Sequence, residues 1–161
     1  MNAKRVFDFS IALVAAVVLA PAMVTIAAVV RATSPGPAWY RGVRVGRHGK
    51  SFRILKFRSM VSDAERLGGS STSSGDARIT PIGRFLRRYK LDELPQLLTV
   101  LRGEMSFVGP RPEVQEYVDL YTDEEKPILE LRPGITDWAS IWNSDEGAVL
   151  AGSDDPDRAY L

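Results

Sequence analysis

The sequence contains no cysteine and only one histidine, His48. Without cysteine, the chain can form no disulfide framework, no thiolate metal site and no cysteine nucleophile. A Ser-His-Asp triad or a zinc centre would depend on that single imidazole. Any chemistry is therefore expected to use carboxylates, arginine, lysine and a hard metal ion.

The chain also has little net charge, because 21 Lys and Arg residues face 20 Asp and Glu residues. The distribution is more informative than the total. Residues 31–58 carry eight Lys or Arg residues and no Asp or Glu. A basic block beside an apolar segment predicts contact with anionic lipid or phosphate, and such a surface could also meet nucleic acid. At 161 residues, the length predicts one domain.

An almost continuous apolar run extends from Phe7 to Val30. As a helix it would be about 36 Å long, which is enough to cross a hydrocarbon core of about 30 Å. Pro21 lies inside the run and predicts a kink. Basic residues flank both ends, and the positive-inside tendency places such flanks in the cytoplasm. We therefore expect a re-entrant membrane helix over residues 1–32 that bends at Pro21, followed by a single cytosolic or interfacial domain over residues 33–161.

Two other interpretations of this run exist. A secretory signal peptide also has basic, apolar and small-residue regions, but here the apolar run continues beyond Ala22 and Asp8 stands at its start. A core helix buried in a soluble domain is the other alternative. Its length and N-terminal position disfavour it.

The remaining chain predicts short elements. Residues 51–60 are expected to form a strand, and residues 67–76 a flexible loop. Thr80 and Pro81 together form a helix-start signature, which predicts a helix to about Tyr89. Further helices are expected from Asp92 to near Gly103, and over residues 113–131 with a break at Pro127. The chain from Pro133 onward is expected to be loop.

Asp92 and Glu93 form the sharpest chemical feature, in the stretch KLDELPQL. Asp92 is predicted to be the N-cap of its helix, with Pro95 tolerated in the first turn. A helix N-terminus favours an ionised carboxylate and binds phosphate, so Asp92 is a credible nucleophile toward phosphorus. Taken alone, the pair could equally be an ordinary cap and its neighbour.

Cationic side chains surround this pair in the sequence. Arg87 precedes it on the predicted helix, and Arg111 follows in a stiff turn with Pro112. Lys56 and Arg58 add further positive charge. These residues are candidate phosphate ligands, since arginine neutralises a diphosphate leaving group while a carboxylate attacks. A solvated or lipid-facing basic surface is the alternative.

Three blocks carry a family resemblance: KFRSM (56–60), LDELPQLLTVLRGEMSFVGPRP (91–112) and RPGIT (132–136). In order and approximate spacing, they resemble the bacterial sugar transferase family, the small monotopic phosphoglycosyl transferases. The resemblance implies an α/β fold that is helix-rich, with a short β hairpin or small sheet, a re-entrant helix and interfacial amphipathic helices. It also implies the cytoplasmic face of the bacterial inner membrane as the location.

The resemblance further implies a ping-pong reaction with magnesium (Mg2+). Asp92 matches the nucleophile, which would attack a UDP-sugar, release UMP and pass the sugar phosphate to a polyprenyl phosphate, such as undecaprenyl phosphate. Glu93 matches the other member of the dyad, and the two carboxylates would also hold the metal. Arg111 and Arg87 match basic residues of the family's site.

The sequence departs from the family pattern in three places. Ala20 precedes the central proline where a serine is common. Residues 137–144 replace a segment that usually contains an arginine. The chain ends at Leu161, where relatives usually continue, so a truncated chain is expected.

A non-enzymatic membrane module that binds anionic lipid is the alternative function, but it gives no reason for the Asp92–Glu93 pair. No stacking array or helix-turn-helix supports a nucleic-acid binder.

Overall fold

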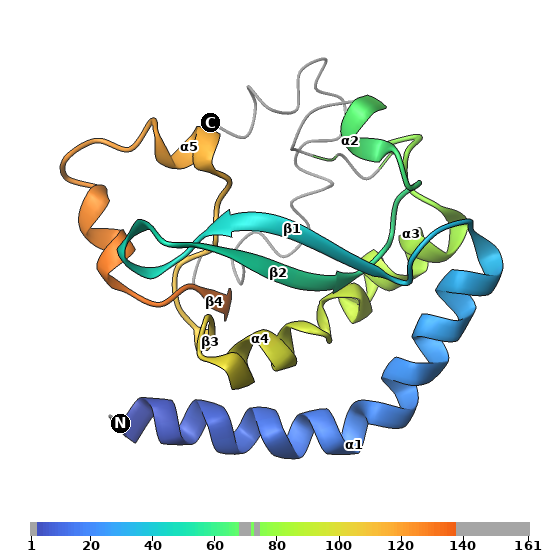
Figure 1. The fold of residues 1–161 in the computed structure, drawn as a ribbon, viewed down its shortest axis with the longest axis horizontal. Helices are drawn as coiled ribbons and strands as arrows, with labels where there is room; N and C mark the ends of the chain where they lie inside the picture. Colours follow the sequence, from blue (N-terminus) through green and yellow to red (C-terminus); the bar gives the residue numbers. More distant parts are fainter. Residues whose placement is uncertain (1–2, 68–71, 73–74, 138–161) are drawn as a thin grey trace.

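The computed structural model describes residues 3–67, 72 and 75–137. Figure 1 shows a long N-terminal helix beneath a mixed assembly of short helices and small sheets. The elements are α1 (Ala3–Thr33), β1 (Trp39–Val45), η1 (Arg47–Gly49), β2 (Ser51–Phe57), α2 (Ala64–Leu67), α3 (Pro81–Arg88), η2 (Leu91–Glu93), α4 (Gln96–Arg102), β3 (Ser106–Val108), α5 (Gln115–Val118), η3 (Lys126–Glu130) and β4 (Gly134–Thr136). The predicted mixture of helices with a hairpin is therefore confirmed.

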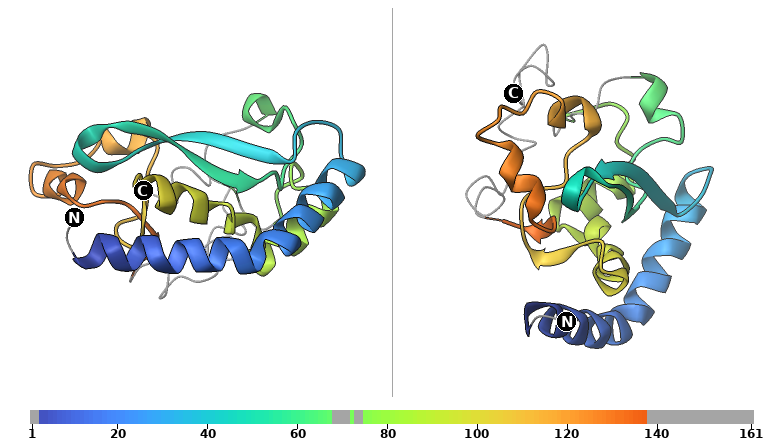
Figure 2. Two further views of the ribbon diagram at one scale, coloured as in Figure 1. Left: turned by 60° about the horizontal axis from the view of Figure 1, so that its bottom comes forward. Right: turned by 60° about the vertical axis from the view of Figure 1, so that its left-hand side comes forward.

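The helix α1 has two arms joined by a bend, which Figures 1 and 2 show from several sides. Pro21 is the proline inside this helix, and a proline removes one backbone donor and crowds the preceding turn. The Thr25 hydroxyl donates to the Pro21 carbonyl at 2.9 Å, a contact of the kind that often accompanies a bent helix. We attribute the bend to this local chemistry.

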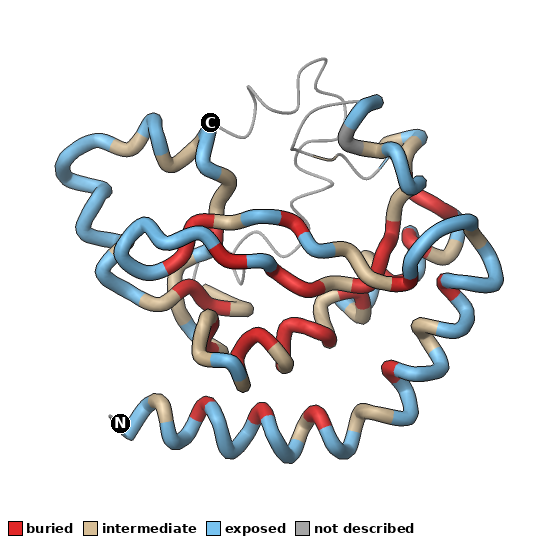
Figure 3. The backbone as a smooth tube through the Cα atoms, viewed as in Figure 1, coloured by how far each residue is buried: buried red, intermediate tan, exposed pale blue. Residues whose placement is uncertain are grey.

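One stripe of α1 faces the rest of the protein, and the opposite side is apolar and exposed. Asp8, Ala12, Ala16, Met23 and Val30 are buried, and Figure 3 shows these positions recurring along one side of the helix. On the other side, large side chains are up to 69% exposed. The alternative of a helix buried in a soluble core is therefore wrong, and a continuous apolar surface of this kind favours contact with a membrane.

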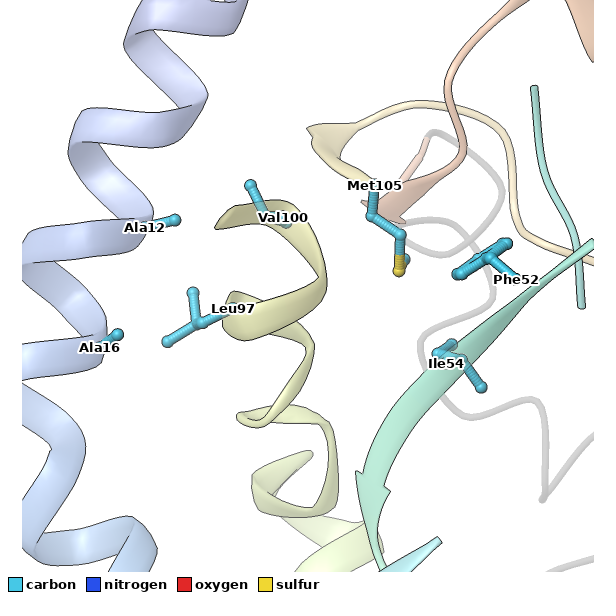
Figure 4. Close-up of a cluster of buried hydrophobic side chains, with 7 residues drawn as sticks. All are labelled: Ala12, Ala16, Phe52, Ile54, Leu97, Val100 and Met105. Carbon is cyan, nitrogen blue, oxygen red and sulfur yellow. The ribbon is translucent and has the colours of Figure 1, made fainter. Parts of the chain in front are cut away.

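Small residues let α1 approach α4 closely. Ala12 and Ala16 pack against Leu97 and Val100, and behind α4 the cluster continues through Met105 to Phe52 and Ile54 of β2 (Figure 4). These seven side chains form one core cluster that extends from α1 to the hairpin. The position of α4 therefore depends on α1 on one side and on β2 on the other.

The hairpin is made of β1 and β2, which pair antiparallel from Trp39 opposite Phe57 to Val45 opposite Ser51. The strand expected over residues 51–60 is confirmed, although it ends at Phe57. The turn between the strands needs left-handed backbone at His48, where φ is 59°.

The helix start at Thr80 is also confirmed. The Thr80 hydroxyl accepts from the Gly83 backbone N–H at 3.0 Å, and α3 then runs to Arg88. The predicted N-cap role of Asp92 is wrong, because the residue lies within the 3-10 turn η2 and α4 begins only after Pro95. The Leu94 and Leu97 backbone N–H groups donate to the Leu91 and Leu94 carbonyls at 3.3 and 3.2 Å, so the stretch before α4 is held by hydrogen bonds of 3-10 spacing. The predicted end of that helix at Gly103 is correct.

The single helix expected over residues 113–131 is wrong in extent. The chain forms the short α5 and the 3-10 segment η3, with a new start at Thr122 between them. The Thr122 backbone N–H and hydroxyl both donate to Glu125 Oε2 at 2.9 Å, a local arrangement that starts a new turn.

The strands β3 and β4 form a small parallel sheet, with Ser106 opposite Gly134 and Val108 opposite Thr136. The loop expected from Pro133 is therefore wrong for residues 134–136, and its continuation from 138 lies outside the described residues. The backbones meet closely, since a Cβ at Gly109 would lie 2.2 Å from the Arg132 carbonyl oxygen. This sheet brings two of the three sequence blocks together.

Candidate active site

Asp92 and Glu93 lie in η2, directly after an unusual backbone turn. Lys90 has left-handed backbone, with φ 55° and ψ 20°, and its carbonyl accepts from the Glu93 N–H at 3.3 Å. Such a conformation costs an L-residue about 1–2 kcal/mol. This turn ends the path of α3 and starts η2 in a new direction. The two carboxylates thus lie in a turn that packs against α3 and β2.

Asp92 is the buried member of the pair. Asp92 is only 6% exposed, and its Oδ1 has no hydrogen-bond partner among the described residues. Burial raises the pKa of the Asp92 carboxyl above its ordinary value; Lys56 and Arg87 partly oppose the rise, and the neighbouring Glu93 charge adds to it. A buried acceptor without a donor is costly in a folded protein, so this oxygen is a natural position for a ligand contact.

Glu93 has the opposite electrostatic surroundings. Its Oε1 accepts from Lys56 Nζ of β2 at 2.7 Å. Burial alone would raise the pKa of Glu93, but Lys56, with Arg111 and Lys90, holds that pKa below its ordinary value. Adjacent carboxylates whose pKa values are shifted in opposite directions are typical of acid–base and covalent sites.

Arg87 approaches Asp92 from α3. Its Nε donates to Ser59 Oγ at 2.9 Å. Burial lowers the pKa of Arg87, whereas the charges of Asp92 and Asp76 oppose that change. Since arginine remains charged in proteins, Arg87 supplies a fixed positive charge beside Asp92.

Arg111 and Pro112 lie on the far side of the dyad, after β3. The Arg111 backbone N–H donates to Asp137 Oδ2 at 3.1 Å, while its guanidinium Nε lies 3.8 Å from Glu113 Oε1. The Arg111 side chain is 46% exposed, and its charge acts on Glu93. Pro112 is buried and stiffens this turn. Arg111 therefore combines proximity to the dyad with access to solvent.

Arg58 points elsewhere. Its guanidinium donates to the Pro35 carbonyl at 2.5 Å and to the Ser34 carbonyl and hydroxyl, each at 2.7 Å, just after α1. These bonds attach the end of α1 to the end of β2. The geometry favours a structural role for Arg58 over the predicted contact with phosphate.

The chain is similar to known proteins over most of its length. The profile of the bacterial sugar transferase family matches residues 1–160. The chain belongs to the bacterial sugar transferase family.

Curated relatives are substantially similar. A UDP-N-acetylgalactosamine-undecaprenyl-phosphate N-acetylgalactosaminephosphotransferase of Aeromonas hydrophila is 40% identical over 142 residues, covering 86% of this chain and 33% of that protein. The uncharacterized sugar transferase EpsL of Bacillus subtilis is 40% identical over 141 residues, covering 88% of this chain and 69% of EpsL. A UDP-glucose:undecaprenyl-phosphate glucose-1-phosphate transferase of Escherichia coli is 39% identical over 142 residues, covering 86% of this chain and 30% of that protein. This sugar transferase chain thus spans about a third of two of these relatives.

A metal ion would have few protein ligands in this sugar transferase. Within residues 3–67, 72 and 75–137, no group of three or more His, Cys, Asp or Glu side chains could hold one. The Asp92–Glu93 pair, with an unbonded buried oxygen on Asp92, nevertheless fits Mg2+, which is usually held by one or two carboxylates together with water and substrate phosphates.

Sequence reasoning missed two residues of the site. Ser59 binds Arg87 across 28 positions of chain, and Lys90 adopts a left-handed turn that usually favours glycine. Ser59 was detectable only as part of the KFRSM block. Nothing in the local sequence indicates the backbone of Lys90.

Proposed function

We propose that this protein is a phosphoglycosyl transferase that moves a sugar phosphate from a UDP-sugar to a polyprenyl phosphate through a covalent Asp92 intermediate. The observation that carries the proposal is the buried Asp92 carboxylate, which lies beside Arg87 and the Glu93–Lys56 pair. Its Oδ1 has no hydrogen-bond partner within residues 3–67, 72 and 75–137. Because no group in the described part of the chain donates to Oδ1, the lone pairs of this oxygen are available to an electrophile.

In the first half-reaction, an Asp92 oxygen attacks the phosphorus next to the sugar. A bond forms between that oxygen and phosphorus, and the bond between this phosphorus and the bridging oxygen breaks. UMP leaves with the bridging oxygen and its electron pair. Arg87, and Arg111 from the open side, stabilise the charge that develops on the phosphate oxygens.

In the second half-reaction, an oxygen of the polyprenyl phosphate attacks the same phosphorus. The bond to Asp92 breaks, the carboxylate is restored, and the product is a polyprenyl diphosphate sugar. Lys56 keeps Glu93 ionised beside this centre. Mg2+ held by Asp92 and Glu93 would supply further neutralisation of the diphosphate oxygens.

We propose that α1 is a re-entrant helix at the cytoplasmic face of the bacterial inner membrane, and the contacts of its two ends support entry and exit on one side. Near its first end, the Arg5 guanidinium donates to the carbonyls of Val100 and Leu101 at 2.6 and 2.8 Å, in the last turn of α4. Just beyond its last residue, Ser34 is held by Arg58. Because both ends are attached to the same domain, the helix would enter and leave a bilayer on one side.

Cysteine labelling tests this topology, since the chain has no native cysteine. The variants Asn2→Cys and Thr33→Cys should both react with a membrane-impermeant maleimide only from the cytoplasmic side. Reaction of the two positions from opposite sides would disprove the re-entrant topology.

The names of the relatives support the substrate classes. The Aeromonas and Escherichia coli proteins are named for transfer from a UDP-sugar to undecaprenyl phosphate. We extend these classes to this chain as UDP-sugar donor and undecaprenyl phosphate acceptor, without assigning the sugar.

The direct test is UMP release by the purified protein with Mg2+, undecaprenyl phosphate and a panel of UDP-sugars. Wild type should release UMP with at least one sugar, and mass spectrometry should detect the phosphosugar on Asp92 when the acceptor is omitted. Asp92→Asn should abolish both signals, and Glu93→Gln should reduce the rate. The proposal fails if no sugar gives UMP or if Asp92→Asn retains near-normal turnover.

A further inference from the structure

Ser59 is a buried serine just after β2 that the proposed reaction does not use directly. It is 7% exposed, and its Oγ accepts from Arg87 Nε at 2.9 Å. The strand β2 itself supplies Lys56, the partner of Glu93. The end of β2 therefore contacts both sides of the dyad, Glu93 through Lys56 and the Asp92 side through Arg87.

The backbone of Ser59 is held in place by the start of α3. Its carbonyl accepts from the Thr80 N–H at 3.0 Å and from the Thr80 hydroxyl at 3.2 Å. A Cβ at Gly83 would lie 1.9 Å from this carbonyl oxygen, so α3 approaches as closely as only a glycine allows. Ser59 is thus a fixed point against which a side chain from the next turn of α3 can be oriented.

Arg87 has a single hydrogen bond of its side chain in the part of the chain that the structure describes, and Ser59 accepts it. The two terminal amino groups of the guanidinium make none there. Both Asp92 and Asp76 attract this cation, and Asp76 is already paired with Arg78 at 2.7 Å. The bond at Nε therefore restrains the guanidinium while its bidentate edge stays available.

We propose that Ser59 is a positioning residue that orients Arg87, so that the two terminal amino groups of the guanidinium bind the phosphate oxygens of the donor's diphosphate at Asp92. A planar guanidinium recognises phosphate in two parallel hydrogen bonds, which requires a defined plane. Ser59 sets that plane by accepting at Nε. This inference rests on the proposed function for the identity of the diphosphate donor, but not for the contact between Arg87 and phosphate.

The first test is independent of turnover. Inorganic pyrophosphate is titrated into the detergent-solubilised full chain while the 15N resonance of Arg87 Nε is followed. In wild type, pyrophosphate should shift this resonance. In Ser59→Ala the affinity should fall about tenfold, and in Ser59→Thr, which keeps a hydroxyl, most of it should return. Ser62→Ala is the matched control, because Ser62 accepts from the guanidinium of Arg58 away from the dyad and should leave the affinity unchanged.

The second test is a double-mutant cycle on UMP release. Ser59→Ala should lower kcat/KM for the UDP-sugar about tenfold in the wild-type background. Lysine has no Nε, so Ser59→Ala should have little further effect in an Arg87→Lys background. A merely structural role for Ser59 would give the same loss in both backgrounds.

The outcomes separate the two proposals. Unchanged pyrophosphate affinity in Ser59→Ala, or equal losses in both backgrounds of the cycle, would overturn the role of Ser59. Absence of UMP release by wild type, together with weaker pyrophosphate binding by Ser59→Ala, would overturn the transferase proposal and leave Ser59 as the residue that orients Arg87 toward phosphate.

Discussion

The polar contact between α1 and β3 provides a quantitative prediction through the substitution Asp8→Ala. Asp8 is 2% exposed, and its Oδ2 accepts from the Ser106 hydroxyl at 2.8 Å and from Lys4 Nζ at 3.2 Å. The Phe107 backbone N–H also donates to this carboxylate. The substitution removes the acceptor of two donors, the hydroxyl of the buried Ser106 and the backbone N–H of the half-buried Phe107.

The expected loss follows from how far each donor is buried. An unsatisfied buried donor costs about 1–3 kcal/mol. Lys4 contributes less than about 1 kcal/mol, because its side chain is 56% exposed and water can replace the carboxylate. Asp8→Ala should therefore lower the free energy of unfolding by about 2–4 kcal/mol, with most of the effect arising at Ser106 and Phe107.

The assay is equilibrium unfolding in detergent micelles, with Ser10→Ala as the control on an exposed position of the same helix. Ser10→Ala should leave the free energy of unfolding nearly unchanged. The double variant Asp8→Ala/Ser106→Ala should cost at least about 0.5 kcal/mol less than the sum of the single variants, because the two side chains share one hydrogen bond. The reasoning is refuted if Lys4→Ala costs as much as Asp8→Ala, or if Asp8→Ala matches the control.

Three further outcomes follow from the burial and packing of single residues. Burial raises the pKa of Asp92, and only the ionised carboxylate can attack phosphorus. The rate of phosphosugar formation should therefore begin to fall, as the pH is lowered, at a pH above the pKa of an ordinary aspartate. A pH–rate profile that stays flat down to about pH 4 would contradict this. Gly83→Ala should destabilise the fold by about 1–3 kcal/mol in chemical unfolding, because its Cβ would clash with a backbone carbonyl, whereas Gly75→Ala has open space and should stay within about 0.5 kcal/mol of wild type. Leu97→Ala should lower the free energy of unfolding by about 2–5 kcal/mol in the same assay, because it opens a cavity between α4 and α1. The exposed Val18→Ala is the control. An equal loss of stability in the two variants would contradict the packing of α1 against α4.

Features that depend on neighbouring residues were predictable from the sequence. The long apolar run with its internal proline predicted a bent helix, and Thr80 followed by Pro81 predicted the start of α3. A strand within residues 51–60 was expected and is present. These predictions succeeded because hydrophobicity, proline geometry and capping act over a few residues.

Helix boundaries set by backbone chemistry were harder to predict. The segment 113–131 breaks because Thr122 and Glu125 form a local turn. Asp92 is not a cap because residues 91–93 form a 3-10 turn of their own before α4. Both errors arose from extending an apparent helical pattern through residues that hydrogen-bond locally instead.

The sequence alone restricted the kind of chemistry that is available, because it contains no cysteine, a single histidine and the Asp92–Glu93 pair. Only the tertiary structure decided which cations serve that pair. Lys56 and Arg58 look equivalent in the sequence, but one donates to Glu93 and the other holds the end of α1. Ser59 gained its candidate role in the same way, since its bond to Arg87 joins residues 28 positions apart. Charge and residue type are local properties of a chain, whereas the direction in which a charge points depends on the packing of α3 against β2.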